Sequence, residues 1–241
     1  MAPHGSRTMK PSSNTVLLIG ASRGLGYAMV EQYLARGWRV IATARAHSTE
    51  RLDALSRQHP GALRVETVDI TEPAQVAALR ARLEGETIDL LFVNAGVVNT
   101  DDEAIVANVA TDEFLRVMLT NTLSPMRVVE ALQDLVPPSG TIGLMSSGQG
   151  SLANNTRAGH EAYRASKAAL NMCMRSFAAR HAEDPRTLLL MAPGWVKTDM
   201  GGPDARLTIE ESIPNLLDTM EAQRGRAGLQ YLDYLGRTVP W

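Results

Sequence analysis

Residues 15–26, TVLLIGASRGLG, decide the fold. The first five are apolar and partly β-branched, which predicts a short buried strand. Glycines at 20, 24 and 26 follow, and residues 25–36 carry apolar side chains at helical spacing. Glycine lets a backbone approach phosphate closely, and a helix N-terminus presents free N–H groups to it, so this order predicts a nucleotide-binding turn. The glycine motif by itself is also compatible with an ordinary strand–helix turn that binds no nucleotide.

Strand-like and helix-like segments alternate from this turn to the end of the chain. The predicted strands are residues 15–19, 39–44, 63–68, 88–93, 141–145, 188–191 and 229–235. Helices are predicted at 25–36, at 112–136 despite Pro125, and at 159–180. A further helix is predicted to begin after an N-cap at Thr71, with Pro73 in its first turn, and another at 208–221 begins with a capping box. This alternation predicts an α/β fold, a Rossmann-type doubly wound sheet of about seven parallel strands with helices on both faces. Ligands bind such sheets at the carboxyl ends of the strands.

Composition narrows the function classes. The 241 residues fit one domain, predicted over 15–241, and the polar residues 1–14 are predicted to be a disordered leader. A net charge of −2 gives no basic field for nucleic acid, and no apolar run is long enough for a membrane span. One cysteine fits a reducing compartment, so we expect a cytoplasmic protein. The histidines lack metal-ligand spacing, so no metal is expected.

The end of the second predicted strand indicates which dinucleotide is preferred. Enzymes that use NAD usually carry an acidic residue there for the ribose hydroxyls. This chain has Ala44 and then Arg45, and Arg23 lies inside the glycine turn. A guanidinium binds a 2′-phosphate that a carboxylate would repel, so the pair favours NADP(H). The alternative is that one or both arginines are ordinary surface residues.

Tyr163 and Lys167 lie four residues apart in a predicted helix, so both can face one ligand. Adding a hydride to a carbonyl requires a proton for the developing alkoxide, which a tyrosine can donate. We expect the nearby Lys167 ammonium to lower the pKa of Tyr163. Ser147, at the end of the fifth strand, is placed to donate a hydrogen bond to the substrate oxygen, and Ser146 is the less favoured candidate. The alternatives are that Tyr163 and Lys167 have this spacing by chance, and that Ser147 only caps a turn at the end of its strand.

Taken together, these motifs resemble the classical short-chain dehydrogenase/reductase family from Thr15 to Trp241. The glycine turn, Asn94-Ala-Gly96, Ser147, Tyr163 with Lys167, and Pro193-Gly194 stand in the family's order. The segments SSGQGS at 146–151 and PGWVKTDMGG at 193–202 are similar to the subgroup of C-factor-like and sniffer-like carbonyl reductases. One departure is Ile19, which replaces a threonine whose hydroxyl often supports the glycine turn.

The resemblance implies roles for individual residues. Tyr163 would be the general acid, Lys167 would hold the nicotinamide ribose, Ser147 would orient the carbonyl, and Asn121 would anchor a proton-relay water. The implied NADP(H)-binding residues, besides Tyr163 and Lys167, are Gly20, Ser22, Arg23, Gly24, Leu25, Gly26, Arg45, Asp69, Ile70, Asn94, Ala95, Gly96, Pro193, Gly194, Val196 and Thr198.

The resemblance also implies an activity. We expect an NADPH-dependent oxidoreductase that reduces an aldehyde or ketone to an alcohol, acting on a small molecule as a homo-oligomer, either a dimer or a tetramer. Two alternatives stay open: an NADP(H)-binding, C-factor-like signalling or regulatory protein with incidental turnover, and a dedicated biosynthetic ketoreductase. The sequence does not distinguish the substrate.

Overall fold

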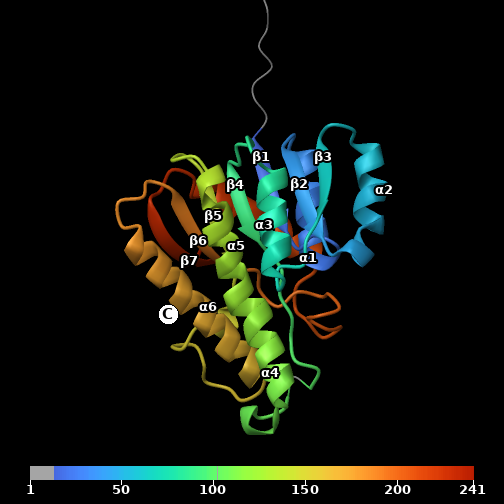
Figure 1. Ribbon diagram of the computed structural model, residues 1–241. Coiled ribbons are helices and arrows are strands. Elements are labelled where there is room, and N and C mark those ends of the chain that lie inside the picture. The colour runs from blue at the N-terminus through green and yellow to red at the C-terminus, as the bar shows by residue number, and fades with distance from the viewer. Residues whose placement is uncertain (1–13, 102) are drawn as a thin grey trace, which may run out of the picture.

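The computed structural model describes residues 14–101 and 103–241, so the predicted leader lies outside the described residues except for Asn14. In the described part, seven parallel strands form one sheet in the order β3-β2-β1-β4-β5-β6-β7 (Figure 1). The strands are β1 (Thr15–Ile19), β2 (Arg39–Ala44), β3 (Leu63–Thr67), β4 (Leu90–Val93), β5 (Thr141–Met145), β6 (Thr187–Ala192) and β7 (Gly228–Asp233). The prediction of a doubly wound parallel sheet of about seven strands is confirmed.

Strand order reverses between β1 and β4, because the chain winds outward to β3 and then returns to the other side of β1. Leu17 pairs with Ile41 of β2 on one side and with Leu91 of β4 on the other. Loops leaving neighbouring strands at such a switch point part in opposite directions and leave a crevice at the carboxyl ends. The loops after β1 and β4 carry the glycine turn and Asn94.

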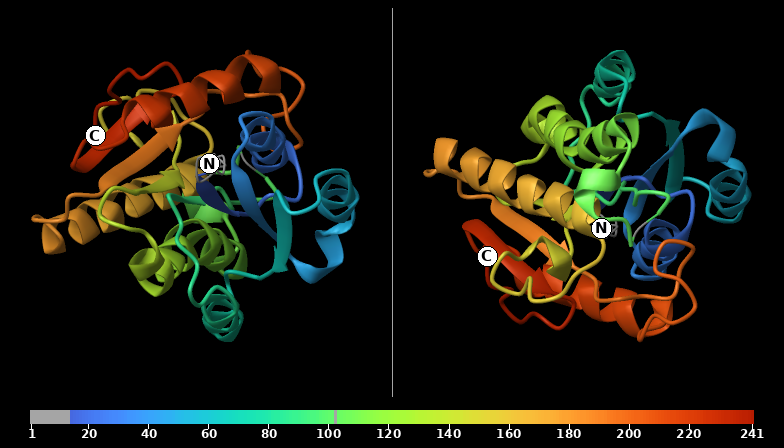
Figure 2. Two further views of the ribbon diagram at one scale, coloured as in Figure 1. Left: turned by 90° about the horizontal axis from the view of Figure 1, so that it is seen from above. Right: turned by 90° about the horizontal axis from the view of Figure 1, so that it is seen from below.

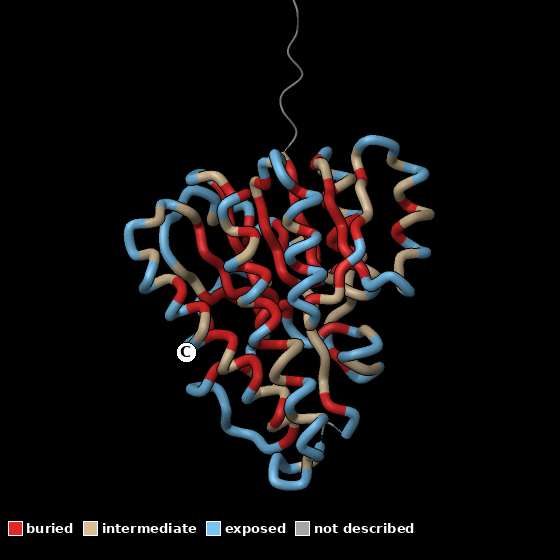
Figure 3. The backbone as a smooth tube through the Cα atoms, viewed as in Figure 1, coloured by how far each residue is buried: buried red, intermediate tan, exposed pale blue. Residues whose placement is uncertain are grey.

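Helices cover both faces of the sheet (Figure 2). Apolar side chains of α3, α5 and α6 form one core with the sheet, and those of α1, α2 and α7 form the second. Between the two layers the five inner strands are almost entirely buried, whereas the edge strands β3 and β7 are buried only in part (Figure 3). The helices are α1 (Gly24–Ala35), α2 (Glu50–Gln58), α3 (Pro73–Arg82), α4 (Thr111–Met118), α5 (Ser124–Leu132), α6 (Glu161–Arg180) and α7 (Ile209–Ala222).

The prediction of one continuous helix over 112–136 is wrong in its continuity. The structure divides it into α4 and α5 around a π turn, Leu119–Leu123, and ends it with a 3₁₀ turn, Gln133–Leu135. Pro125 has no N–H to donate to the carbonyl of Asn121, which disfavours a regular α-helix at this point. In the π turn the N–H of Ser124 donates instead to the carbonyl of Leu119.

Smaller differences concern helix ends. Glu72, not Thr71, occupies the N-cap position of α3, because Pro73 is the first helical residue and Thr71 instead donates to Asp69. The predicted capping box of α7 is present between Thr208 and Glu211. Helix α2 is absent from the predicted elements, although Leu52 and Leu55 are its two buried residues. Among the described residues, no helix is both long and apolar enough to cross a membrane.

Candidate active site

The glycine turn connects β1 to α1 at the switch point. Gly20 has a φ of +87°, and a Cβ there would lie 2.8 Å from Ala95. A Cβ on Gly26 would lie 2.2 Å from the carbonyl oxygen of Gly20. Any side chain at either position would therefore force the turn open. The turn is held by Asn94, whose Nδ2 donates to the carbonyl of Gly20 at 2.7 Å.

A hydroxyl supports the turn although Ile19 is not a threonine. Thr43 of β2 accepts from the N–H of Gly20 through its Oγ1 at 3.1 Å, and its carbonyl accepts from Ala21 at 2.8 Å. Thr43 is buried. The neighbouring strand therefore supplies a hydroxyl contact, which sequence analysis missed because Gly20 and Thr43 are 23 positions apart.

The start of α1 suits a phosphate. Its N-cap, Arg23, makes no side-chain hydrogen bond to the helix, so the N–H groups of the first turn are not capped by that side chain. Gly24 faces Thr198, since a Cβ on Gly24 would lie 3.7 Å from the Thr198 methyl carbon. Backbone donors and glycine surfaces thus line a cradle between the loops after β1 and β6, which fits a dinucleotide pyrophosphate.

The two arginines predicted to select the cofactor occupy different surroundings. Arg23 forms an ion pair with Asp199, 2.6 Å between Nη1 and Oδ2, and both side chains are mostly exposed. Arg45 directly follows β2 and is exposed. Burial raises the pKa of Asp69, but the hydrogen bonds from Thr71 lower it by more in total, with a smaller contribution from the charge of Arg45. Asp199 was not anticipated as a partner, because it is 176 residues from Arg23.

The other predicted cofactor residues follow the carboxyl ends of β1, β3, β4 and β6. Ile70 is buried in the core, so any contact it makes with a nucleotide is through its main chain. Val196 is buried as well and pairs with Leu207 in an isolated bridge. Pro193 accepts a hydrogen bond from Ser212, and Gly194 has a φ of +85°. Ser22, Leu25, Ala95 and Gly96 are partly buried beside the glycine turn.

Ser147 and Tyr163 are brought together at the carboxyl end of β5. Ser147 opens the 3₁₀ turn Gly148–Gly150, and its Oγ accepts from the N–H of Gln149 at 3.1 Å. The side chains of Ser147 and Tyr163 are hydrogen-bonded. Burial raises the pKa of Tyr163 to about 12, and the bond with Ser147 opposes that rise. Ser146, the less favoured candidate, is buried and donates to Asn171 at 2.6 Å.

Lys167 lies beside this pair. Its Nζ is 5.8 Å from the centre of the Tyr163 ring and donates to the carbonyl of Met145 at 2.9 Å. Burial lowers the pKa of Lys167 to about 8, and among the described residues no carboxylate opposes that shift. Burial dominates the pKa of Tyr163 in the structure, and the expectation that Lys167 lowers this pKa stays a prediction for the site with nucleotide bound.

Asn121 completes the group from the π turn. It is fully buried, and its carboxamide both accepts from and donates to the main chain of Val97, at 2.8 and 2.7 Å. Its Nδ2 also lies 3.0 Å from the Oγ of Ser166 on α6. A Cβ on Gly96 would lie 3.3 Å from Asn121 Oδ1 and 3.5 Å from Lys167 Nζ. The loop after β4, the π turn and α6 therefore meet at this point.

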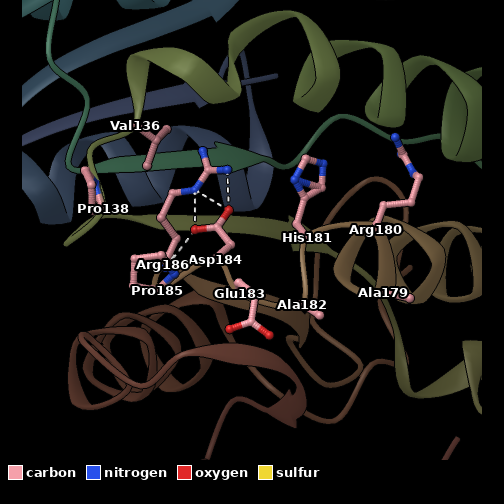
Figure 4. Close-up of a pocket in the computed structure, with 10 residues that line it drawn as sticks. All are labelled: Val136, Pro138, Ala179, Arg180, His181, Ala182, Glu183, Asp184, Pro185 and Arg186. Atoms are coloured by element: carbon pink, nitrogen blue, oxygen red, sulfur yellow. Dashed lines mark hydrogen bonds and ion pairs between the residues drawn. The ribbon is translucent and has the colours of Figure 1, made fainter.

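A separate surface groove of about 540 Å³ lies at the amino ends of the strands, beside the residues that precede β5 and β6 (Figure 4). Its Arg186 is paired with Asp184 and also donates to Gln133, and its Arg180 is paired with Glu130. We do not place the chemistry there, because these charges are already matched by the protein itself. Within 14–101 and 103–241, no group of three or more His, Cys, Asp or Glu side chains could hold a metal ion.

A glycine turn at the switch point of a parallel sheet, with a serine, a tyrosine and a lysine beside it, defines a Rossmann-type dinucleotide-binding protein. Residues 14–206 match the sequence model of the family described as short chain dehydrogenase. The chain belongs to the short-chain dehydrogenase family, as the sequence predicted.

Three similar proteins refine this picture. The C-signal protein of Myxococcus xanthus is 36% identical over 156 residues, which cover 64% of this chain and 93% of that protein. A putative short-chain dehydrogenase/reductase from Burkholderia multivorans, solved with bound NADP, is 57% identical with a TM-score of 0.92, covering 95% of this chain and 100% of that one. A carbonyl reductase from Pseudomonas aeruginosa, solved with NADP, is 36% identical with a TM-score of 0.88 and the same coverage.

Proposed function

We propose that this protein is an NADPH-dependent carbonyl reductase with Tyr163 as its general acid. The observation that carries the proposal is the hydrogen-bonded pair of Ser147 and Tyr163 beside the buried ammonium of Lys167. A tyrosine whose pKa is about 12 is protonated at neutral pH, so it carries the proton that the carbonyl oxygen requires. The carbonyl reductase and the Burkholderia protein described above, both solved with NADP, support the choice of reaction and cofactor.

The proposed reaction assigns one task to each side chain. NADPH, when bound, supplies the hydride that reaches the carbonyl carbon. Ser147 donates a hydrogen bond to the carbonyl oxygen and polarises it. Tyr163 transfers its hydroxyl proton to the same oxygen as negative charge develops there, which yields the alcohol. Lys167 holds the ribose hydroxyls, and its charge stabilises the phenolate left on Tyr163.

Asn121 has a supporting part in this proposal. Its carbonyl lacks the α-helical donor that Pro125 cannot provide, and its side chain lies close to Gly96, as does the ammonium of Lys167. We assign to it the water through which Lys167 and Tyr163 regain a proton. The cofactor contacts are assigned to the glycine turn, to Asn94, and to the loop from Pro193 to Thr198.

The cofactor preference rests on charge at the end of β2. Ala44 leaves no carboxylate to repel a 2′-phosphate, and Arg45 and Arg23 offer guanidinium groups to bind it. Two bidentate contacts worth about 3 kcal/mol would favour NADPH over NADH by more than about a hundredfold. We also infer that residues 15–241 act as a single domain and that the protein forms a homo-oligomer in the cytoplasm.

The test is NADPH consumption over a panel of aldehydes, ketones and diketones, run with NADH in parallel. We expect turnover with NADPH on at least one compound, and a loss of about a thousandfold or more in kcat for Tyr163→Phe with unchanged NADPH binding. A Tyr163→Phe variant that keeps wild-type turnover would overturn the assignment of the acid. Tight NADPH binding without turnover on any compound would instead favour a regulatory role.

A further inference from the structure

Tyr231 holds the main chain of Ser147 from the neighbouring part of the sheet. It is only 2% exposed near the centre of β7, and its hydroxyl donates a hydrogen bond to the carbonyl oxygen of Ser147. The same oxygen accepts from the N–H of Gly150 at 2.9 Å. Two donors from different elements therefore fix one peptide plane, which adjoins the Cα from which the Ser147 side chain departs.

The Tyr231 hydroxyl is part of a buried polar cluster, which we define as Tyr231, Ser146 and Asn171. Burial raises the pKa of Tyr231, and the side chains of Asn171 and Ser146, which lie beside its hydroxyl, oppose that rise. Ser146 donates to Asn171 Oδ1 at 2.6 Å. Asn171 in turn donates to the carbonyl of Gly150 at 3.2 Å. The cluster thus holds both ends of the turn from Ser147 to Gly150 and joins them to β7 and α6.

Trp241 supports the cluster from outside. Its ring lies 5.3 Å from the ring of Tyr231, and the guanidinium of Arg175 lies 4.7 Å from its centre. The main-chain oxygen of Trp241 accepts from the N–H of Ala153 at 2.9 Å. Trp241 therefore contacts both Tyr231 and the loop that continues from the Ser147 turn.

We propose that Tyr231, backed by Trp241, is a positioning residue for Ser147 and sets where the serine hydroxyl meets the substrate. This inference rests on the proposed function. The hydroxyl of Tyr231 uses its donor on Ser147, so it acts through the serine and not on the substrate. A displacement of about 1 Å in an oriented catalytic group can lower the rate about a hundredfold. The single hydrogen bond from Tyr231 to the carbonyl of Ser147 can therefore affect kcat.

The test compares Tyr231→Phe with Tyr33→Phe. Tyr33 is a matched control, because it is also buried and its ring lies 5.0 Å from Trp38, but it belongs to α1. We expect Tyr231→Phe to lower kcat for carbonyl reduction about tenfold or more, while the Kd for NADPH stays within about twofold of wild type. Tyr33→Phe should change neither. Unchanged kcat in Tyr231→Phe, or an equal loss in Tyr33→Phe, rejects the proposal.

Two further measurements separate this proposal from the proposed function. Hydrogen exchange on the peptide spanning residues 147–153 needs no turnover, and Tyr231→Phe should speed exchange at the amides of Gln149 and Gly150, whereas Tyr33→Phe should not. Unchanged exchange there rejects the positioning role even if no carbonyl is ever reduced. Trp241→Leu should reproduce part of both effects, and Trp241→Phe, which keeps an aromatic ring against Tyr231, should restore wild-type behaviour.

Discussion

Lys167 is 3% exposed, and its Nζ donates a hydrogen bond to the carbonyl of Met145. Burial lowers its pKa from 10.5 to about 8, which means that the fold disfavours the charged form. A shift of this size corresponds to about 3 kcal/mol of destabilisation while the group stays protonated. The residue that the proposed chemistry requires is therefore one that weakens the nucleotide-free protein.

This argument predicts that Lys167→Met stabilises the protein while abolishing activity. At pH 7, without nucleotide, we expect a gain of about 1–2 kcal/mol in the free energy of unfolding, since the lost hydrogen bond offsets part of the relief. Between pH 8 and 10.5 the unfolded wild type holds a proton that the folded form has released, so wild-type stability rises with pH and the gain shrinks.

Urea unfolding at about pH 7 and about pH 10 measures both effects. Lys197→Met is the control, because Lys197 is exposed and its removal should change stability little at either pH. A Lys167→Met variant that is less stable than wild type at neutral pH would contradict the account of a costly buried charge.

Residues linked by local spacing could be predicted, and residues linked only by the fold could not. Tyr163 and Lys167 are one helical turn apart, so their shared face follows from the sequence. Tyr231 reaches Ser147 across 84 positions, and nothing around a tyrosine in a strand-like segment indicates that contact. Arg23 was predicted as a phosphate ligand, but its ion pair with Asp199 depends on two loops meeting.

At the scale of elements, the π turn between α4 and α5 determines where Asn121 points. One extra residue per turn rotates the following side chains by about 100° relative to a regular helix. In the structure the turn directs Asn121 between Val97 and Ser166. The neighbouring Thr122 donates to the carbonyl of Ser166 at 2.8 Å, which ties the turn to α6.

We predict that Pro125→Ala lowers kcat about tenfold without destabilising the protein. Alanine restores the N–H that can donate to the carbonyl of Asn121, which favours a regular helix and moves the Asn121 side chain from its present contacts. Thermal melting and steady-state kinetics together measure this. Pro214→Ala is the matched control, since Pro214 also lies inside a helix, α7. It should leave kcat unchanged, and an unchanged kcat in Pro125→Ala would refute the role of the turn.

Element existence was easier to predict than element continuity. Strands β1, β2 and β5 have the predicted ends, because short apolar runs bounded by turns mark them clearly. The break within 112–136 was not predicted, since its apolar spacing is helical on both sides and Pro125 can sit near a helix start. The N-cap of α3 was misplaced by one residue, which is the usual precision of helix ends.

At the scale of the whole molecule, the sheet topology places segments that are distant in the sequence next to one another in the candidate active site. The glycine turn, Asn94, Ser147 and the Pro193 loop all follow strands of one parallel sheet, so they lie together at the carboxyl ends of its strands. That gathering follows from the alternation of strands and helices, which is why the sequence suffices to place the predicted active-site residues in one region. The contribution of β7 could not be anticipated, because its central Tyr231 acts through its side chain and not through the loop that follows it.

Helices α4 and α6 also present an apolar surface, which we define as Leu115, Leu123 and Met172. These side chains are 60%, 46% and 62% exposed, on α4, the π turn and α6. The elements lie side by side on the face of the molecule seen in Figure 1. Exposed apolar side chains on neighbouring elements are what an interface between copies would cover, and they support the proposed homo-oligomer.

We predict that Leu123→Asp combined with Met172→Asp converts the protein to a monomer. A stable interface buries about 1,200 Å² or more, and charges in its apolar centre should raise the dissociation constant by about a hundredfold or more. Sedimentation velocity at micromolar concentration should show a dimer or tetramer for the wild type and a monomer for the variant. Met200→Asp, at a similarly exposed residue outside this surface, should sediment as the wild type does. A double variant that still associates as the wild type does would show that the contacts between copies are made by another face, because two buried carboxylates facing their counterparts could not be accommodated in this one.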